Sequence, residues 1–308
     1  MRRLLFVLAA IAALASGSHA SAPNSLGGSA ARDSVLDAQY CPGHAKRRLD
    51  VFFPHDSFAS PRPVVVYVHG GAWIEGDKGF HREHLLYYPV RARLLQSGYV
   101  FATVNYRLAG TTDGPGVVTA FPAQVEDVKC AIRHLRHEAR RYRIDGRRIA
   151  LWGFSAGAHI AALVGTLPRG SHEGSGPHAG TPSDVRAVLL QSAITDLGRR
   201  RDFTRMEPYL ERAFPGYDRR PRSIVRQASP ITYADGSDPP FFLLHGARDQ
   251  YVSAEQSIRL HARLGGNRKG HTLSVVPGAF HSFSGTSERV LNDLADSMVA
   301  FFDAHIGG

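Results

Sequence analysis

Residues 150–163 read ALWGFSAGAHIAAL. A strand is predicted over 148–152, and its apolar residues lead into GFSAG at 153–157; a run typical of a helix follows over 155–166. A serine between two glycines at a strand-to-helix junction fits the G-x-S-x-G turn, whose strained backbone exposes the hydroxyl. The stretch therefore predicts that Ser155 is a nucleophile. The alternative is an ordinary serine in a glycine-lined turn.

The remaining chain alternates between apolar runs and helix-like segments. Strands are expected at 48–53 (an edge strand), 64–68, 99–105, 148–152, 187–191, 241–245 and 272–276, and helices at 81–97, 122–143, 155–166, 253–265 and 287–304. This alternation predicts an α/β fold with a mostly parallel central sheet and helices on both faces. In such sheets, ligands bind beyond the C-terminal ends of the strands.

A serine hydroxyl becomes a good nucleophile only when a base removes its proton. His281 follows the last predicted strand and can supply that base, while Asp249 follows the preceding strand and can orient the imidazole. The order Ser155, Asp249, His281 is typical of serine hydrolases built on parallel sheets. These three residues are the predicted catalytic triad.

Other side chains compete for these roles. His159 lies one helical turn after Ser155 but should point into the packing behind the turn. Asp196 follows another strand and is the alternative acid, although a capping role suits it better. His69 and His245 end buried strands and are expected to brace loops by hydrogen bonds.

The stretch HGGAW at 69–73 directly follows the predicted strand at 64–68. Glycines at this point let the backbone approach a substrate carbonyl closely. We expect the amides of Gly71, Ala72 and Ala156 to form an oxyanion hole for the tetrahedral intermediate.

The N-terminus has the three parts of a secretory signal peptide. A basic start is followed by an unbroken apolar run over 4–15 and by the cleavage-site pattern SHA at 18–20. We expect a signal peptide over 1–20, a flexible lead-in over 21–45, a catalytic domain over 46–308, and a periplasmic or secreted location without stable membrane insertion. An uncleaved anchor or a buried N-terminal helix is the alternative.

The chain has 308 residues and a formal net charge of +10. Its arginines are scattered, with no basic stripe interleaved with aromatic residues, so nucleic acid is not an expected partner. The 16 histidines lack companion ligands at metal-binding spacing, so no metal or other cofactor is expected. The oligomeric state stays open.

Only two cysteines, Cys41 and Cys130, are present. In an exported protein they could pair, but a buried free thiol in the predicted helix over 122–143 is equally natural.

Two stretches interrupt the alternating pattern. Residues 169–183 should be a surface loop, and the arginine-rich segment 196–230 should be a cap or lid, or else a plain crossover helix. Its arginines suggest substrates with an acidic group.

Several motifs together resemble those of a known family. They are VVVYVHGGAW at 64–73, GDK at 76–78, VNYRLA at 104–109, FPAQVEDV at 121–128, GFSAG at 153–157 and LLHGARD at 243–249. The chain from about residue 46 resembles the α/β-hydrolase esterases, above all the BD-FAE-like (feruloyl esterase-like) and kynurenine formamidase-like group. Hormone-sensitive-lipase-type carboxylesterases are related, but this chain has HGGA where they have HGGG.

This resemblance implies hydrolysis by Ser155, His281 and Asp249 without a metal or organic cofactor. Asp77, Lys78, Arg107 and Asp127 also match family positions, where we interpret them as polar contacts that fix loops. The predicted function is an exported serine hydrolase that cleaves small-molecule carboxylic esters through an acyl-enzyme. The alternatives are an amide hydrolase of formamidase or peptidase type and a non-catalytic binding protein of this fold.

Overall fold

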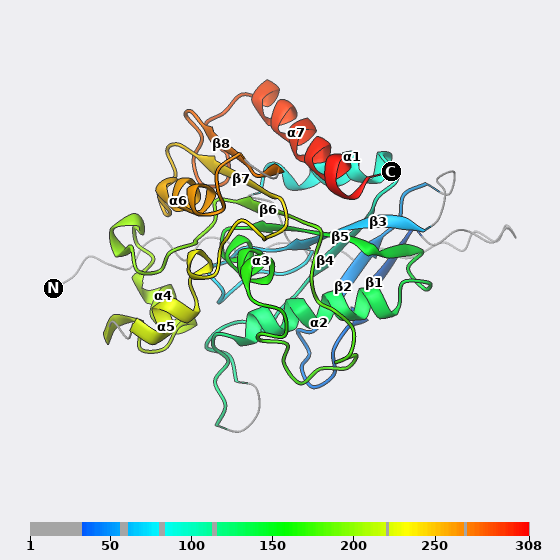
Figure 1. Ribbon diagram of the computed structural model, residues 1–308, viewed down its shortest axis with the longest axis horizontal. Helices are drawn as coiled ribbons and strands as arrows, with labels where there is room; N and C mark the ends of the chain where they lie inside the picture. Colours follow the sequence, from blue (N-terminus) through cyan, green and yellow to red (C-terminus); the bar gives the residue numbers. More distant parts are fainter. Residues whose placement is uncertain are drawn as a thin grey trace, which may run out of the picture. The chain divides into compact units, whose positions relative to one another are not determined.

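The computed structural model describes residues 33–55, 61–79, 84–112, 116–219, 222–267 and 270–307. Its strands are β1 (Ser34–Gln39), β2 (Arg48–Phe52), β3 (Arg62–Val68), β4 (Val100–Val104), β5 (Ile144–Phe154), β6 (Ala187–Gln191), β7 (Phe241–Gly246) and β8 (Thr272–Val276). They form one eight-stranded sheet in the order β1-β2-β4-β3-β5-β6-β7-β8 (Figure 1). The predicted signal peptide over 1–20 lies outside the described residues.

Helices cover both faces of this sheet (Figure 1). One face carries α1 (Tyr87–Gln96) and α7 (Glu288–Ile306), and the other carries α2 (Ala123–His137), α3 (Ala156–Thr166) and α6 (Glu255–Arg263). β1 pairs with β2 and β2 with β4 in antiparallel fashion, whereas every other pairing is parallel. The predicted α/β fold with a mostly parallel sheet is confirmed.

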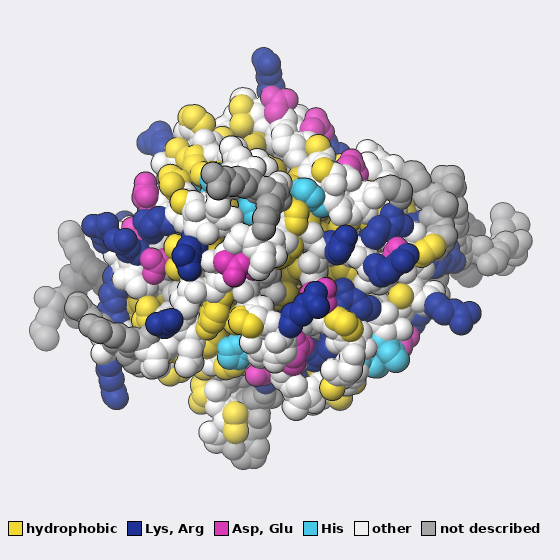
Figure 2. Space-filling view, in the orientation of Figure 1, with side chains coloured by type: hydrophobic (Ala, Val, Ile, Leu, Met, Phe, Trp, Pro, Cys, Tyr) yellow, Lys and Arg dark blue, Asp and Glu magenta, His cyan; other side chains and the backbone are white. Residues whose placement is uncertain are grey.

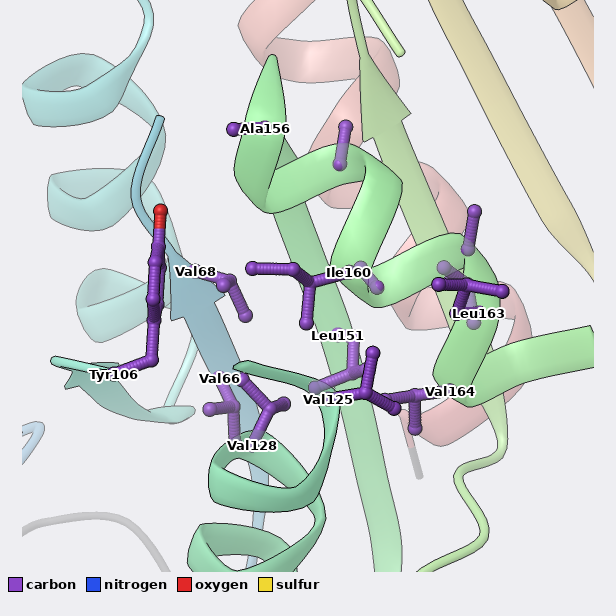
Figure 3. Close-up of a cluster of buried hydrophobic side chains, with 14 of the residues drawn as sticks. Val66, Val68, Tyr106, Val125, Val128, Leu151, Ala156, Ile160, Leu163 and Val164 are labelled. Carbon is purple, nitrogen blue, oxygen red and sulfur yellow. The ribbon is translucent and has the colours of Figure 1, made fainter. Parts of the chain in front are cut away.

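Successive residues of the central strands face two different cores. In β3, Val64, Val66 and Val68 pack on the side of α2 and α3, while Val65 and Tyr67 pack on the side of α1 and α7. Figure 3 shows the first core where α2 and α3 lie on β3 and β5. Because these strands are buried on both faces, they read in the sequence as continuous apolar runs.

The N-terminal edge of the sheet differs from the prediction. The strand expected at the edge, β2, lies between β1 and β4, and the edge strand is β1. The predicted flexible lead-in is therefore wrong over Ser34–Gln39. The reason is that β1 is held by backbone pairing with β2, such as Val35 with Val51, while its Leu36 side chain is 60% exposed. The sequence of such an edge strand shows no alternation of apolar and polar residues by which the strand could be recognised.

Cys41 and Cys130 form a disulfide, with their Cα atoms 6.4 Å apart. The bond joins the segment after β1 to the middle of α2, so the free-thiol alternative for Cys130 is wrong. Residues 169–183 form a loop without helix or strand, as expected. Gly176 of this loop lies against the bridge, because a Cβ there would stand 2.5 Å and 2.6 Å from the two sulfurs.

The segment 196–230, called the cap below, follows β6. Its short helices are η1 (Arg200–Asp202), α4 (Glu207–Ala213), η2 (Tyr217–Arg219) and α5 (Arg222–Gln227). The cap borders the C-terminal end of the sheet, since Phe203 forms a β-bridge with Val252 after β7. Phe214 packs edge-on against Trp73 after β3, with ring centroids 5.0 Å apart.

Candidate active site

The turn between β5 and α3, residues 153–157, is called the elbow below. Ser155 has φ 54° and ψ −118°, in the left-handed half of backbone space where a residue with a side chain is strained. The flanking glycines are required by close main-chain contacts. A Cβ on Gly157 would overlap the carbonyl oxygens of Val68 and His69, and one on Gly153 would overlap the first turn of α3.

The strained turn presents the serine hydroxyl to a histidine. Ser155 Oγ lies 2.9 Å from His281 Nε2, and His281 Nδ1 lies 2.7 Å from Asp249 Oδ2. The three residues follow β5, β8 and β7 respectively, at the same end of the parallel sheet. The structure thus brings together the three side chains that the sequence singled out, with the imidazole between the hydroxyl and the carboxylate.

The side chain of Asp249 is completely buried and surrounded by donors. Its Oδ1 accepts hydrogen bonds from the amides of Tyr251 and Val252, each at 2.9 Å, and its Oδ2 also lies 3.2 Å from His245 Nε2. Burial raises the pKa of this carboxyl, but hydrogen bonds from His245 and His281 outweigh burial and hold the pKa well below its usual range. Asp249 is therefore a carboxylate at neutral pH and accepts from the imidazole.

His281 is also held through its backbone and ring. Its carbonyl accepts from Ser192 Oγ at 2.8 Å, and its amide donates to Gln250 Oε1 at 3.3 Å. Phe154 and Tyr251 flank the ring, with centroids 5.2 Å and 5.4 Å away. Sequence reasoning missed Ser192 and Gln250, although both are polar residues close behind strand ends.

Residues 69–73, called the oxyanion loop below, lie beside the elbow. A Cβ on Gly70 would stand 3.3 Å from Ser155 Cβ. Gly71, Ala72 and Trp73 have φ values of 102°, 48° and 63°, three consecutive residues in the left-handed region. Within the described residues, the amides of Gly71 and Ala72 donate no hydrogen bond.

The third predicted donor, Ala156, is the first residue of α3, so the helix offers no acceptor for its amide. The helix N-terminus also favours negative charge at this point. The predicted oxyanion donors thus sit on the two loops that border the serine hydroxyl.

His159, the alternative base, does not reach the hydroxyl. It is buried in α3, where its Nδ1 accepts from the Trp73 indole at 3.1 Å and its Nε2 donates to the Ala228 carbonyl at 2.7 Å. Burial lowers its pKa to about 4, with the Ala228 carbonyl opposing the shift. Asp196, the alternative acid, accepts from the amide of Gly198 at 2.9 Å and so caps a turn.

A buried glutamine supports the elbow from the neighbouring strand. The amide of Ser155 donates to the carbonyl of Gln191 at 2.8 Å. The Gln191 side chain is fully buried, and its Oε1 lies 2.7 Å from His84 Nε2 and 3.3 Å from Trp152 Nε1. The sequence reasoning did not find this group, because its members come from different elements.

Two histidines at strand ends brace loops, as predicted. His245 Nδ1 lies 2.8 Å from Ser257 Oγ, and its Nε2 lies 3.0 Å from the Val252 carbonyl. His69 Nδ1 lies 2.7 Å from the Gly70 carbonyl, and its ring stacks on Tyr106 at 4.3 Å.

The remaining family-matched positions form polar contacts away from the hydroxyl. Lys78 pairs with Asp50 at 2.9 Å, and Arg107 pairs with Asp127 at 2.9 Å. Asp77 Oδ2 accepts from the Asn105 side chain at 2.8 Å. These contacts agree with a role in fixing loops and the sheet edge.

Figure 2 shows Lys and Arg side chains spread over one face, with Asp and Glu between them. Across the described ranges, no three or more His, Cys, Asp or Glu side chains form a group that could hold a metal ion. Nor is any helix in that part of the chain both long and apolar enough to cross a membrane.

Comparisons with known proteins agree with this geometry. Esterase LipC of Mycobacterium tuberculosis is 31% identical over 76% of this chain and 56% of its own length. Esterase LipQ of the same organism is 30% identical over 80% of this chain and 56% of its own length. The chain thus spans just over half the length of these curated relatives.

A solved structure, the truncated form of a carbohydrate esterase from gut microbiota, superposes with a TM-score of 0.69 at 25% identity, covering 88% of this chain and 98% of that one. The likeness confirms the α/β-hydrolase fold. A family model described as BD-FAE matches residues 49–264. By these matches and by the layout of its site, the chain belongs to the BD-FAE family of α/β-hydrolases.

Proposed function

We propose that this protein is an exported serine hydrolase that cleaves carboxylic esters. The observation that carries the proposal is the hydrogen-bonded series from Ser155 Oγ through His281, at 2.9 Å, to Asp249, at 2.7 Å. A hydroxyl, an imidazole and a buried carboxylate in this order form the arrangement that activates a serine for acyl transfer. The esterase names of the LipC and LipQ relatives support an ester as the substrate.

In the first half of the reaction, Ser155 Oγ attacks the ester carbonyl while His281 Nε2 accepts the hydroxyl proton. Asp249 accepts a hydrogen bond from His281 Nδ1–H, and this bond fixes the tautomer of His281 and stabilises its imidazolium form. The carbonyl oxygen becomes an oxyanion, and the amides of Gly71, Ala72 and Ala156 donate to it.

The tetrahedral intermediate then collapses. The bond to the leaving alcohol breaks, the alcohol takes the proton from His281 Nε2, and the acyl group stays on Ser155 Oγ. In the second half, His281 removes a proton from water, and the resulting attack releases the acid and restores the serine hydroxyl. The cycle consumes one water and needs no other co-reactant.

Export is supported by the disulfide between Cys41 and Cys130. Structural disulfides form and persist mainly in oxidising compartments such as the periplasm or the exterior. The predicted signal peptide over 1–20 agrees with this. A fusion of residues 1–45 to a reporter that is active only after export should give signal, and the same fusion beginning at residue 21 should not. Equal signal from the two fusions would contradict export.

Hydrolysis of a panel of p-nitrophenyl esters, compared with the matching anilides, tests the reaction. The ester series should be cleaved, and a fluorophosphonate probe should label the protein. Ser155→Ala should abolish labelling and lower kcat by about a million-fold. Ser97→Ala, at the exposed end of α1, is the matched control and should change neither the labelling nor kcat. Faster anilide cleavage would indicate an amide hydrolase, and a wild-type protein that neither reacts nor is labelled would indicate a binding protein.

A further inference from the structure

His159 occupies an unusual position between the oxyanion loop, the elbow helix and the cap. It is one turn after Ser155 in α3 and is only 1% exposed. Its two ring nitrogens bond to segments far away in the chain: Nδ1 accepts from the Trp73 indole, 86 residues earlier, and Nε2 donates to the Ala228 carbonyl, 69 residues later. The proposed reaction uses neither nitrogen.

The Trp73 side chain also contacts two aromatic rings in this neighbourhood. Its ring meets the His159 ring edge-on at 5.3 Å and the Phe214 ring edge-on at 5.0 Å. Phe214 in turn packs edge-on against His159 at 5.5 Å. The three rings form a closed aromatic cluster whose members come from the oxyanion loop, α3 and the cap.

Trp73 is also the last of the three consecutive left-handed residues in the oxyanion loop. Such backbone conformations are costly for residues other than glycine and persist only where their surroundings hold them. Main-chain bonds hold two carbonyls of the loop: that of Gly71 accepts from the amides of Ile74 and Glu75, each at 3.0 Å, and that of Trp73 accepts from Ala109 at 2.8 Å. The Gly71 and Ala72 amides themselves must stay free to receive an oxyanion. The anchored indole adds a side-chain restraint at Trp73, the residue directly after Ala72.

We propose that His159 is a positioning residue that fixes the Gly71 and Ala72 amides through Trp73 and couples them to the cap. The proposal rests on the ester hydrolysis assigned to Ser155. The imidazole suits this role because it accepts at one nitrogen and donates at the other in the same plane, provided that it stays neutral. Its burial, which lowers the pKa to about 4, keeps it neutral at ordinary pH.

Two conservative variants separate the two hydrogen bonds. In His159→Asn, Oδ1 can replace Nδ1 as the acceptor for Trp73, but nothing reaches Ala228. In His159→Gln, the terminal amide can reach the Ala228 carbonyl, but the acceptor for Trp73 is lost. We expect His159→Asn to keep kcat within a few-fold of the wild type and His159→Gln to lower it at least tenfold, since complete loss of one oxyanion donor costs about 100- to 1,000-fold.

The loss should have the signature of transition-state stabilisation. In His159→Gln, kcat and kcat/KM should fall together while KM stays constant. The inhibition constant of a trifluoromethyl ketone, which forms a tetrahedral adduct with the serine, should rise by the same factor. Trp73→Phe should lower kcat by the same factor as His159→Gln. In the double variant, kcat should fall no further than in either single variant.

A merely structural role predicts a different pattern. Thr166→Val, which removes a buried hydroxyl at the far end of α3, is the matched control and should lower the melting temperature without lowering kcat. Equal kcat values for the Asn and Gln variants, or kcat losses that follow melting temperature across all variants, would overturn the proposal.

A readout independent of activity comes from fluorescence, because the chain has only two tryptophans. The Trp73 emission, obtained as the difference between the wild type and Trp73→Phe, should shift in a His159→Gln background and stay unchanged in a His159→Asn background. If the wild type hydrolysed no ester, the proposed function would fail, whereas this shift would still decide whether His159 anchors Trp73.

Discussion

The elbow and the oxyanion loop lie side by side and both hold left-handed residues, but they are held in different ways. The elbow is fixed by main chain against main chain: Gly157 packs on the carbonyls of Val68 and His69, and the Ser155 amide bonds to β6. The oxyanion loop also has main-chain bonds, from the amides of Ile74 and Glu75 to the Gly71 carbonyl, but in addition it depends on side chains from other elements. Tyr106 donates to the His69 carbonyl at 3.0 Å, and His159 holds the Trp73 indole.

This difference teaches where the site tolerates change. A loop fixed by backbone contacts has no side chain to lose, but it cannot accept even one extra methyl group. A loop that also relies on side chains from other elements responds to substitutions in those distant elements. Ser155 therefore sits, with the predicted oxyanion donor Ala156, on the half of the site that main-chain contacts hold. The predicted donors Gly71 and Ala72 sit on the half that also depends on side chains from other elements.

Among the tests of this comparison, the one with the largest expected effect isolates the oxyanion loop. Asp249→Asn leaves both loops in place but favours the wrong imidazole tautomer, so kcat should fall about 10,000-fold. The residual rate should then come from the oxyanion hole and substrate binding. Adding His159→Gln should lower that residual rate further, as measured by the initial velocity of ester cleavage at saturating substrate. A double variant no slower than Asp249→Asn would show that the two loops do not act separately.

The second prediction tests the rigidity of the elbow. Gly157→Ala should lower the free energy of unfolding by about 3 kcal/mol, because the added methyl group meets main-chain oxygens that cannot move aside. Urea denaturation measures this loss. Gly180→Ala is the control, since a Cβ there has no neighbour within 4 Å, and it should change stability by less than about 0.5 kcal/mol. Similar losses in both variants would refute a rigid elbow.

The third prediction concerns acid. Burial lowers the pKa of His159 from 6.5 to about 4. Between about pH 4 and pH 6.5, His159 therefore binds a proton in the unfolded chain but stays neutral in the folded chain. Stability from this site is complete above about pH 6.5 and falls as the pH drops towards 4. Lowering the pH from about 7 to about 4.5 should therefore lower the melting temperature of the wild type more than that of His159→Asn. A difference independent of pH would contradict the neutral imidazole.

The smallest predicted effect lies within the oxyanion loop itself. Ala72 has φ 48°, which costs a residue with a Cβ about 1 kcal/mol. Ala72→Gly removes this strain but gives the unfolded chain more freedom, so the free energy of unfolding should change by less than about 1 kcal/mol. Because the glycine also loosens the loop, kcat should fall a few-fold. Unchanged kcat would mean that Trp73 and His159 alone define the loop.

Much of this molecule could be predicted from the sequence. The central strands were found because burial on both faces makes them continuous apolar runs. The central strand predicted at 187–191 and the edge strand predicted at 272–276 both have the observed bounds. Ser155, Asp249 and His281 were found because each directly follows such a strand. Their meeting is a consequence of parallel strands that share one C-terminal edge.

What could not be predicted depends on contacts between distant elements. β1 carries exposed side chains and is defined by its pairing with β2, so no apolar pattern marks it. The helix predicted over 122–143 ends at His137, and residues 138–143 form turns. The hydrogen bond between His84 and Gln191 joins residues 107 positions apart, so no local spacing in the sequence predicts it.

The disulfide has a consequence for damage to the chain. Cys41 and Cys130 are 89 positions apart in the sequence, and the oxyanion loop at 69–73 lies between them. A protease that cuts one peptide bond in this interval leaves two fragments still joined through sulfur, whereas Ser155, Asp249 and His281 lie outside it. If the cut falls between residues 73 and 130, the fragment that carries the oxyanion loop stays tethered by the disulfide to the fragment that carries Ser155.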